Sequence, residues 1–274
     1  MPCDKKVRSR KPHTCQKVDE LLTLLTHCFV REGSKLDSAH VNLSRGASMP
    51  FDTSGLPQPP DARAWSFTEG FSAETSSMIE ARRRSAELKA HFVSPATGSA
   101  LQFLARAIQA QHIVEIGTST GGATQWLVKA LPEDGQITSI DVDGEHHRIA
   151  KELFTRADIP LHLTRLITGR PAEVLPRLSD GAYDMVVIAS DASDLNPLLD
   201  QAVRLLRLGG LVVVLDAFGG GKVGDPAQRD SATVARRLLV QRMGNDPRLT
   251  PSLLPVGDGL LAAVVNSYEL PADH

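Results

Sequence analysis

The stretch HIVEIGTSTGG, residues 112–122, is the part of the sequence that decides the fold. Its apolar start is typical of a buried strand, and its glycines predict a tight loop leading into a helix near Gly122. The free backbone N–H groups at the start of such a helix face the crevice at the carboxyl ends of the strands. We therefore expect a strand, a ligand-binding loop and a helix here.

Short apolar runs alternate with helical patterns on both sides of this stretch. Strands are predicted at residues 112–117, 136–141, 161–168, 183–189 and 210–217. Helices are predicted at 65–90, 95–109, 123–130, 145–157, 172–178, 196–206 and 226–243. This alternation indicates an α/β fold, in which parallel βαβ units form an open, doubly wound sheet.

The end of the chain narrows the fold class. Two apolar runs, residues 251–255 and 260–265, are separated by the turn VGDG. A loop that short joins only antiparallel strands, because a parallel pair needs a crossover of about a dozen residues or more. We therefore expect a mostly parallel seven-stranded sheet that ends in an antiparallel hairpin. A nicotinamide-binding Rossmann domain would end with another βα crossover instead.

Composition sets broad limits on function. The chain has 274 residues, 42% of them hydrophobic, and a net charge of −2, so we expect one main domain and no general attraction to nucleic acid or to an acidic membrane. The three cysteines all lie within the first 28 residues, and a core without disulfides fits the cytoplasm. The longest apolar run near the start, residues 21–30, is too short and too polar to span a bilayer.

Residues 1–60 differ in character from the rest of the chain. They open with a basic segment and close with the loop-like MPFDTSGLPQPPD at 49–61. We interpret them as a disordered N-terminal tail before a catalytic domain at 61–268. An alternative is that translation starts at Met49, and a native peptide from residues 12–31 would refute it.

The charge of the glycine loop points to the ligand. A dinucleotide fingerprint needs G-x-G-x-x-G to seat a pyrophosphate, whereas here Gly117 and Gly121 enclose no middle glycine and Glu115 lies two residues earlier. A carboxylate there repels a pyrophosphate but suits the cationic methionine end of S-adenosylmethionine. Asp141, at the end of the next predicted strand, can accept the ribose hydroxyls.

Several motifs occur together in a fixed order: VSPATG (93–98), EIGTSTGG (115–122), ITSIDVD (137–143), GRPAEVLPRL (169–178), YDMVVI (183–188), GGLVVVLD (209–216), GDPAQRD (224–230) and PVGDGLL (255–261). In this combination the chain resembles the catechol and caffeoyl-CoA O-methyltransferase family, class I S-adenosylmethionine-dependent enzymes with a Rossmann-like fold, and particularly its small actinobacterial members. The resemblance covers about residues 65–266.

The resemblance implies a set of cofactor contacts. They fall on Val93, Glu115, Gly117, Thr118, Ala123 and Asp141. Gly169, Arg170 and Pro171 follow the third predicted strand and could line the adenine pocket. At Ala123 the family usually has serine, so one hydroxyl that would reach the carboxylate of the donor is missing.

The metal site is where the chain departs from the family. The family typically reads D-A-D-K after the fourth strand and D-N after the fifth, and these aspartates and the asparagine hold a divalent cation. The three ligand positions correspond to Ala189, Asp216 and Ala217, and the lysine is replaced by Ala192. We therefore predict no tight metal site. A one-residue shift of the alignment would put Asp191 in the place of the first ligand.

Without the metal and the lysine, the sequence leaves open which residue removes the proton of the acceptor hydroxyl. We predict Asp191 and Asp216 as the catalytic residues, with Asp194 or His146 as alternatives. For His146 and His147, exposed positions at a helix start are the simpler expectation.

The leading hypothesis is an O-methyltransferase acting on a hydroxyl of a small molecule. A non-catalytic S-adenosylmethionine-binding or regulatory protein is the alternative, and a nicotinamide oxidoreductase is disfavoured by Glu115. The resemblance also implies a homodimer, in which the predicted helix at 72–90 could cover a partner's cleft as well as its own. Arg82, Arg83 and Arg84 on that helix are interpreted as a solvated face, with an acidic substrate as the alternative.

Overall fold

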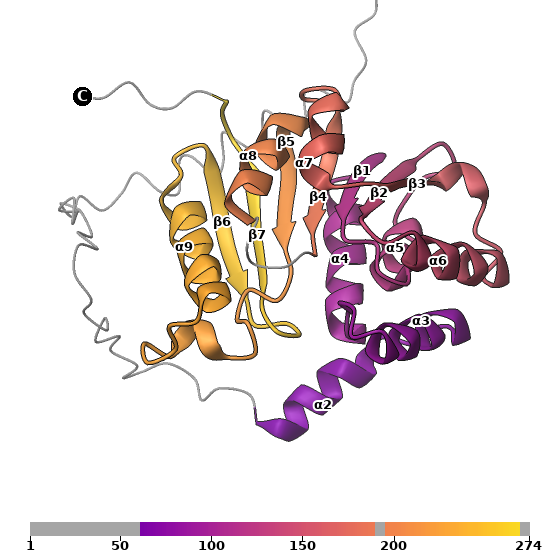
Figure 1. Cartoon of the computed structure of the whole chain (residues 1–274), viewed down its shortest axis with the longest axis horizontal. Coiled ribbons are helices and arrows are strands. Elements are labelled where there is room, and N and C mark those ends of the chain that lie inside the picture. Colours follow the sequence, from indigo (N-terminus) through magenta and orange to yellow (C-terminus); the bar gives the residue numbers. More distant parts are fainter. Residues whose placement is uncertain (1–60, 190–194, 269–274) are drawn as a thin grey trace, which may run out of the picture. The chain divides into compact units, whose positions relative to one another are not determined.

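The computed structural model describes residues 61–189 and 195–268, which form a seven-stranded sheet with helices on both faces (Figure 1). The strands are β1 (His112–Ile116), β2 (Gln136–Asp141), β3 (Thr164–Thr168), β4 (Tyr183–Ile188), β5 (Leu206–Val214), β6 (Leu249–Leu254) and β7 (Leu260–Val265). Their order across the sheet is β3-β2-β1-β4-β5-β7-β6. The order reverses between β1 and β4, which is where an open α/β sheet forms its ligand crevice.

The strand directions confirm the predicted sheet. Neighbouring strands from β3 to β5 pair in parallel. Strand β7 lies between β5 and β6 and is antiparallel to both. The predicted terminal hairpin is therefore present, and its second strand is the one that joins the parallel part.

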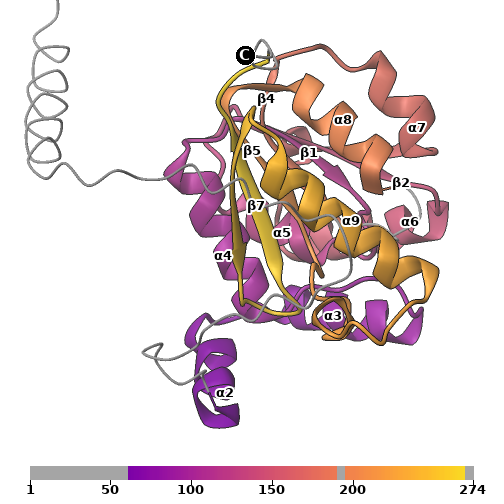
Figure 2. The same ribbon diagram turned by 90° about the vertical axis from the view of Figure 1, so that its left-hand side faces the viewer.

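Helices cover both faces of the sheet. They are α2 (Ala62–Phe71), α3 (Ser76–Glu87), α4 (Pro95–Ala107), α5 (Gly122–Val128), α6 (Gly144–Arg156), α7 (Pro171–Val174), α8 (Leu195–Leu205) and α9 (Ser231–Asn245), with short 3-10 turns η1 (Leu161–Leu163), η2 (Leu175–Arg177) and η4 (Lys222–Gly224). Figure 2 shows α4 on one side of β5 and β7, and α8 and α9 on the other.

The core explains why β4 is a continuous apolar run. Val186 packs into the cluster that includes Leu199 of α8 and Met243 of α9. Its neighbour Val187 packs into the opposite cluster, with Leu101 of α4 among its members. Successive side chains of a strand point to opposite faces, so a sheet covered on both faces needs apolar residues at every position.

The predicted helix at 65–90 is wrong as one element, because it is two helices. Helix α2 ends at Phe71, and Ser72 is extended. Thr75 then caps α3 by accepting a hydrogen bond from the backbone N–H of Met78 (3.3 Å). Serine and threonine side chains compete for backbone groups and favour helix starts over helix interiors.

Several other boundaries also differ from the prediction, and strand β5 begins at Leu206, four residues earlier than predicted. Residues 161–163 form η1 before β3, because the backbone turns at Pro160. The predicted helix at 172–178 is α7 followed by η2. Helix α9 begins at Ser231, five residues later than predicted, since Asp230 caps it by accepting from the backbone N–H of Thr233 (3.0 Å).

In the part of the chain that the structure describes, no helix is both long and apolar enough to cross a bilayer.

Candidate functional site

The loop between β1 and α5 is shaped by two glycines. Gly117 has a φ of 96° and Gly121 a φ of 83°, in the left-handed region that L side chains rarely adopt. A Cβ added to Gly117 would lie 2.2 Å from the carbonyl oxygen of Ala189, which follows β4. The predicted strand, loop and helix are thus confirmed, and the glycine brings the loop backbone against the neighbouring strand.

Glu115 lies near the carboxyl end of β1 and is completely buried. Its Oε2 accepts hydrogen bonds from the hydroxyls of Thr124 (2.6 Å) and Ser139 (2.5 Å). Its Oε1 is buried without a hydrogen-bond partner among the described residues. Desolvation raises the pKa of Glu115 to about 7, although these two hydrogen bonds oppose it. The free oxygen therefore marks a place that suits a cationic group.

Asp141, the last residue of β2, lies on the other side of the glycine loop from Glu115. Its Oδ2 accepts from the backbone N–H of Ser119 (2.8 Å), in the glycine loop. Its Oδ1 accepts from the backbone N–H of Asp143 (3.0 Å) and lies 3.2 Å from His146 Nδ1. Asp141 is thus beside the loop, where the predicted ribose contact requires it, and that contact stays a prediction.

The expectation for the two histidines of α6 is wrong for His147, which is buried. Its Nε2 lies 3.0 Å from Thr118 Oγ1 and its Nδ1 lies 2.8 Å from Thr168 Oγ1. The first turn of α6 packs on the ends of β2 and β3, so its inner histidine joins the polar network. His146 is partly buried and contacts Asp141 and Asp143. If His146 acted as the general base, it would therefore do so on the side of the crevice where the methyl donor is predicted to bind.

The other predicted cofactor residues lie around the same crevice. Val93 and Ala123 belong to the core cluster at the start of α5. Thr118 Oγ1 lies 2.6 Å from Ser139 Oγ, which links it to Glu115. Their contacts with the cofactor stay predictions.

The predicted adenine segment follows β3. The backbone N–H of Gly169 donates to Asp141 O (2.8 Å), which places this segment next to the end of β2. Arg170 is exposed, and Pro171 is the first residue of α7. The role of these three residues at the adenine ring stays a prediction.

Helix α3 and the segment that follows it pack on the glycine loop, which was not predicted from the sequence. Ser85 Oγ lies 2.9 Å from Ser119 Oγ and 2.7 Å from Thr120 Oγ1. Ser119 Oγ donates to His91 O (2.6 Å), and Thr120 Oγ1 donates to Ala81 O (2.6 Å). In the sequence, only the consecutive hydroxyl side chains of the loop indicated such contacts, and they did not identify the partner residues.

The carboxyl ends of β4 and β5 lie across the crevice. Ala189 and Ala217 are buried, with their methyl groups at two of the predicted metal-ligand positions. Asp216 is partly exposed, and its Oδ2 lies 2.6 Å from His91 Nε2. Asp191 and the alternative Asp194 lie outside the described residues. His91 is therefore a polar group of this site that the sequence analysis missed.

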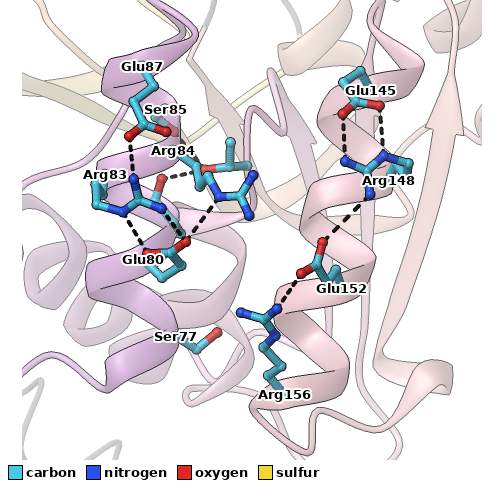
Figure 3. Close-up of polar contacts among 12 residues, drawn as sticks. Ser77, Glu80, Arg83, Arg84, Ser85, Glu87, Glu145, Arg148, Glu152 and Arg156 are labelled. Atoms are coloured by element: carbon cyan, nitrogen blue, oxygen red, sulfur yellow. Dashed lines mark hydrogen bonds and ion pairs between the residues drawn. The ribbon is translucent and has the colours of Figure 1, made fainter.

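The three consecutive arginines of α3 are paired with acids, as a solvated face requires. Arg82 binds Glu74 through two hydrogen bonds. Figure 3 shows Arg83 and Arg84 on Glu80, and Arg83 also on Glu87. The same figure shows a ladder of charges along α6, from Glu145 to Arg156. These guanidinium groups are occupied, which argues against the acidic-substrate alternative.

Two cavities lie away from this crevice. One, of ≈ 260 Å³, is lined by Arg165, Arg177 and Tyr183 among others. The other, of ≈ 500 Å³, is lined by Arg204 and Tyr268 among others. Neither is lined by a predicted site residue.

Comparison with known proteins agrees with this geometry. A family model described as O-methyltransferase matches residues 69–265, which is most of the chain. The chain belongs to this O-methyltransferase family. The resemblance inferred from the motifs is thereby confirmed.

The relatives of this O-methyltransferase include proteins of mycobacteria. A Mycobacterium marinum protein named as an O-methyltransferase is 42% identical over 220 residues, which cover 80% of this chain and 98% of the relative. A Mycobacterium tuberculosis relative (strain H37Rv), also named as an O-methyltransferase, is 41% identical over 214 residues, 78% of this chain and 96% of the relative.

Solved structures of similar proteins contain the methyl donor or its product. The O-methyltransferase TomG from Streptomyces achromogenes, involved in tomaymycin synthesis and solved with S-adenosylmethionine, has a TM-score of 0.68 and 27% identity, covering 76% of this chain and 100% of its own. An O-methyltransferase from Bacillus cereus, solved with S-adenosylhomocysteine, has a TM-score of 0.66 and 25% identity, covering 74% and 99%. This O-methyltransferase therefore uses S-adenosylmethionine.

The residues present fit the methyl donor better than they fit the family's metal. The free oxygen of Glu115 is an unpaired acceptor for a cationic donor. At the metal-ligand positions the described residues offer one carboxylate, Asp216, and two methyl groups. A hard divalent ion needs several oxygen ligands, and these described positions supply one carboxylate.

Proposed function

We propose that this O-methyltransferase methylates a hydroxyl of a small molecule without a tightly held divalent cation. The observation that carries the proposal is the contrast across the crevice. A buried carboxylate with a free oxygen, Glu115, lies on one side, and Ala189 and Ala217 replace oxygen ligands on the other. The degraded metal site is part of the proposal.

Each part of the crevice then has a role. When bound, S-adenosylmethionine supplies an electrophilic methyl group on a sulfonium. Glu115 stabilises the positive end of the donor, and Asp141 accepts its ribose hydroxyls. Gly117 allows the backbone to approach it closely. Asp216 and Asp191 are proposed to serve the acceptor hydroxyl, which loses its proton during the transfer.

Calorimetry and methyl-transfer assays test this proposal. We expect S-adenosylmethionine and S-adenosylhomocysteine to bind in the micromolar range, and a phenolic acceptor to be methylated equally with EDTA or with Mg²⁺. An absence of binding heat would contradict it. Binding without methyl transfer across a broad phenol panel would instead favour the non-catalytic alternative, which the names of the relatives do not support.

A homodimer is proposed from the surface of α2. Phe67 and Phe71 are 74% and 80% exposed, and Phe103 of α4 is 71% exposed. Helix α2 buries none of its residues within the described chain. Exposed aromatic groups of this kind mark interaction surfaces. We expect light scattering to give a dimer mass, and F67S/F71S to give a monomer with unchanged S-adenosylhomocysteine affinity.

The remaining assignments are also proposals. They are a methyltransferase domain at 61–268 with residues 1–60 as an appendage, a cytoplasmic location, and partners that include neither nucleic acid nor membrane. The net charge of −2 supports the last of these. Limited trypsin digestion of the full chain should leave a fragment that begins near residue 61 and still binds S-adenosylhomocysteine.

A further inference from the structure

A series of hydrogen bonds leads from the buried carboxyl of Glu115 to the surface at Thr168. Ser139 Oγ donates to Glu115 Oε2 (2.5 Å) and lies 2.6 Å from Thr118 Oγ1. Thr118 Oγ1 in turn lies 3.0 Å from His147 Nε2, and His147 Nδ1 lies 2.8 Å from Thr168 Oγ1. The four inner members are at most 4% exposed, whereas Thr168 is exposed. The series therefore connects a carboxyl of the donor site with solvent.

Each hydrogen bond of this series can point in one of two directions. Within the described residues, the Ser139 hydroxyl contacts only Glu115 and Thr118. In the same part of the protein, the Thr118 hydroxyl contacts only Ser139 and His147. A hydroxyl has one hydrogen to donate, and a neutral imidazole donates from one nitrogen and accepts at the other. Each member thus donates to one neighbour and accepts from the other, so the direction of one hydrogen bond fixes all of them.

The ionised form of Glu115 sets one direction. A carboxylate only accepts hydrogen bonds, so Ser139 donates to Glu115 and Thr118 donates to Ser139. His147 then donates to Thr118 from Nε2, and its Nδ1 accepts from Thr168. All the donors of the series point towards the carboxylate in this state.

The protonated form of Glu115 sets the opposite direction. A hydrogen on Oε1 would have no partner among the described residues, which leaves a buried donor unsatisfied. Thr124 donates to Oε2 (2.6 Å), and it keeps that hydrogen bond if the hydrogen on Oε2 points to Ser139. Ser139 then donates to Thr118, which donates to Nε2 of His147. The ring hydrogen of His147 is on Nδ1 in this state.

The two titratable members of the series respond differently to burial. Desolvation lowers the pKa of His147, which keeps its ring neutral. The charged and titratable groups that act on His147 are Asp141, Asp143, Lys151 and His146. Desolvation raises the pKa of Glu115 to about 7 against its two hydrogen bonds, while Asp141 raises it and His91 lowers it more weakly. Glu115 is thus the member that changes charge near neutral pH.

We propose that Ser139, Thr118, His147 and Thr168 form a reversible relay that couples the ionisation of Glu115 to binding of the methyl donor, with His147 as its positioning residue. The inference rests on the proposed role of Glu115 at the positive end of the donor. When the donor binds, the hydrogen of Glu115 moves to Ser139, and each following member passes its own hydrogen to the next. The ring hydrogen of His147 changes from Nδ1 to Nε2, and Thr168 releases one proton to water. The carboxylate that holds the donor is then stabilised by hydrogen bonds that polarise one another.

The ring tautomer of His147 provides the first test, because ¹⁵N spectra report which ring nitrogen carries the hydrogen. His147→Gln assigns the signal in the full-length protein. We expect mainly Nδ1–H in the free protein at pH 6, and Nε2–H both in the free protein at pH 8.5 and at pH 6 with saturating S-adenosylhomocysteine. A tautomer that is the same in these three states overturns the proposal, as does a His147 ring that is charged at pH 6.

Two variants that each remove one hydrogen bond from Glu115 Oε2 separate the relay from a general effect on the site. Ser139→Ala interrupts the relay, whereas Thr124→Val removes the other donor and leaves the relay intact. We expect the tautomer of His147 to stay the same in S139A and to respond in T124V as in the wild type. A response in S139A, or none in T124V, overturns the proposal. Thr118→Val interrupts the relay at the next hydrogen bond and should behave as S139A does.

The pH dependence of donor affinity provides the last test. His147→Leu removes the donor to Thr118, so Glu115 ionises less readily, whereas His147→Gln keeps an amide that can donate to Thr118. We expect H147L to bind S-adenosylhomocysteine about threefold more weakly than the wild type at pH 6 and equally at pH 8.5, where Glu115 is ionised in both proteins. H147Q should match the wild type at both pH values. An equal loss in H147L at both pH values, or none at pH 6, overturns the proposal.

These measurements distinguish failure of the relay from failure of the proposed function. If S-adenosylhomocysteine does not bind to the wild type, the proposed function fails, and the tautomers of His147 at pH 6 and pH 8.5 alone decide whether the relay exists. If it binds and the tautomer does not change, the donor site stands and the relay fails.

Discussion

The two halves of the site are built in different ways. The donor half, Glu115, Gly117, Thr118 and Asp141, comes from β1, the loop after it and β2, within one short βαβ unit. The acceptor half, His91, Ala189, Asp216 and Ala217, comes from three segments that only the folded sheet brings together. The difference teaches that a cofactor can be bound by local chain geometry, whereas the proton chemistry depends on long-range packing.

The largest expected effect comes from breaking the donor half at its backbone. Gly117→Ala places a Cβ 2.2 Å from the carbonyl oxygen of Ala189 and forces alanine to a φ of 96°. Overpacking and strain together should lower the free energy of unfolding by about 3–5 kcal/mol, measured by urea denaturation. Gly144→Ala is the control, because nothing lies within 4 Å of its added Cβ and it begins α6. A G117A protein within about 1 kcal/mol of the wild type would contradict the close approach.

A smaller effect is expected at the ribose contact. Asp141→Asn should weaken S-adenosylhomocysteine binding about 10–100-fold, since hydrogen bonds to a charged group contribute about 1.5–3 kcal/mol. Calorimetry measures the change. Asp143→Asn is the matched control, because asparagine also caps a helix and Asp143 is exposed. Equal losses in the two variants would show that Asp141 acts through local structure alone.

The pH dependence of donor binding sharpens the role of Glu115. The cationic donor needs the carboxylate form, and the pKa of Glu115 is about 7 in the free protein. Binding should therefore release a proton, and affinity for S-adenosylhomocysteine should fall about tenfold per pH unit below about pH 7. Titrations between pH 5.5 and 7.5 measure this slope. Glu115→Gln should abolish it.

The free energy of unfolding should change with pH in the opposite direction to the binding affinity, over the same pH range. A raised pKa in the folded state means that the native chain holds a proton that the unfolded chain releases, so stability is lost as pH rises from about 4.5 to about 7. Without ligand, E115Q should accordingly be more stable than the wild type at pH 8, by about 3 kcal/mol at most. A wild-type unfolding free energy that does not change over this window, relative to E115Q, would contradict the raised pKa.

The smallest expected effect comes from restoring a missing donor contact. Ala123→Ser returns the hydroxyl that the family usually offers to the carboxylate of the donor, and one neutral hydrogen bond contributes about 1 kcal/mol at most here. We expect S-adenosylhomocysteine to bind about threefold more tightly. Methylthioadenosine lacks that carboxylate and serves as the control ligand. Tighter binding of both ligands would assign the gain to packing.

The sequence predicted the fold, and it predicted that Gly117 and Asp141 lie beside one crevice, because these signals are local. The apolar runs, the spacing of Gly117 and Asp141 and the turn VGDG each fix the structure within a few residues. His147 was misplaced because the burial of a helix face depends on the strands beneath it. His91 carried no signal at all, since its partner Asp216 is distant in the chain and meets it only in the folded sheet.

The insertion of β7 between β5 and β6 affects the order in which parts of the protein can fold during synthesis. The backbone N–H groups of Ala217 and Phe218 donate to Gly259 and Asp258, at the start of β7 (2.9 and 2.8 Å). During synthesis, the strands of the donor half can pair as soon as β4 has left the ribosome. The turn that carries Asp216 gains these hydrogen bonds only when nearly the whole chain has emerged. A nascent chain would thus be able to hold the methyl donor before it could use it.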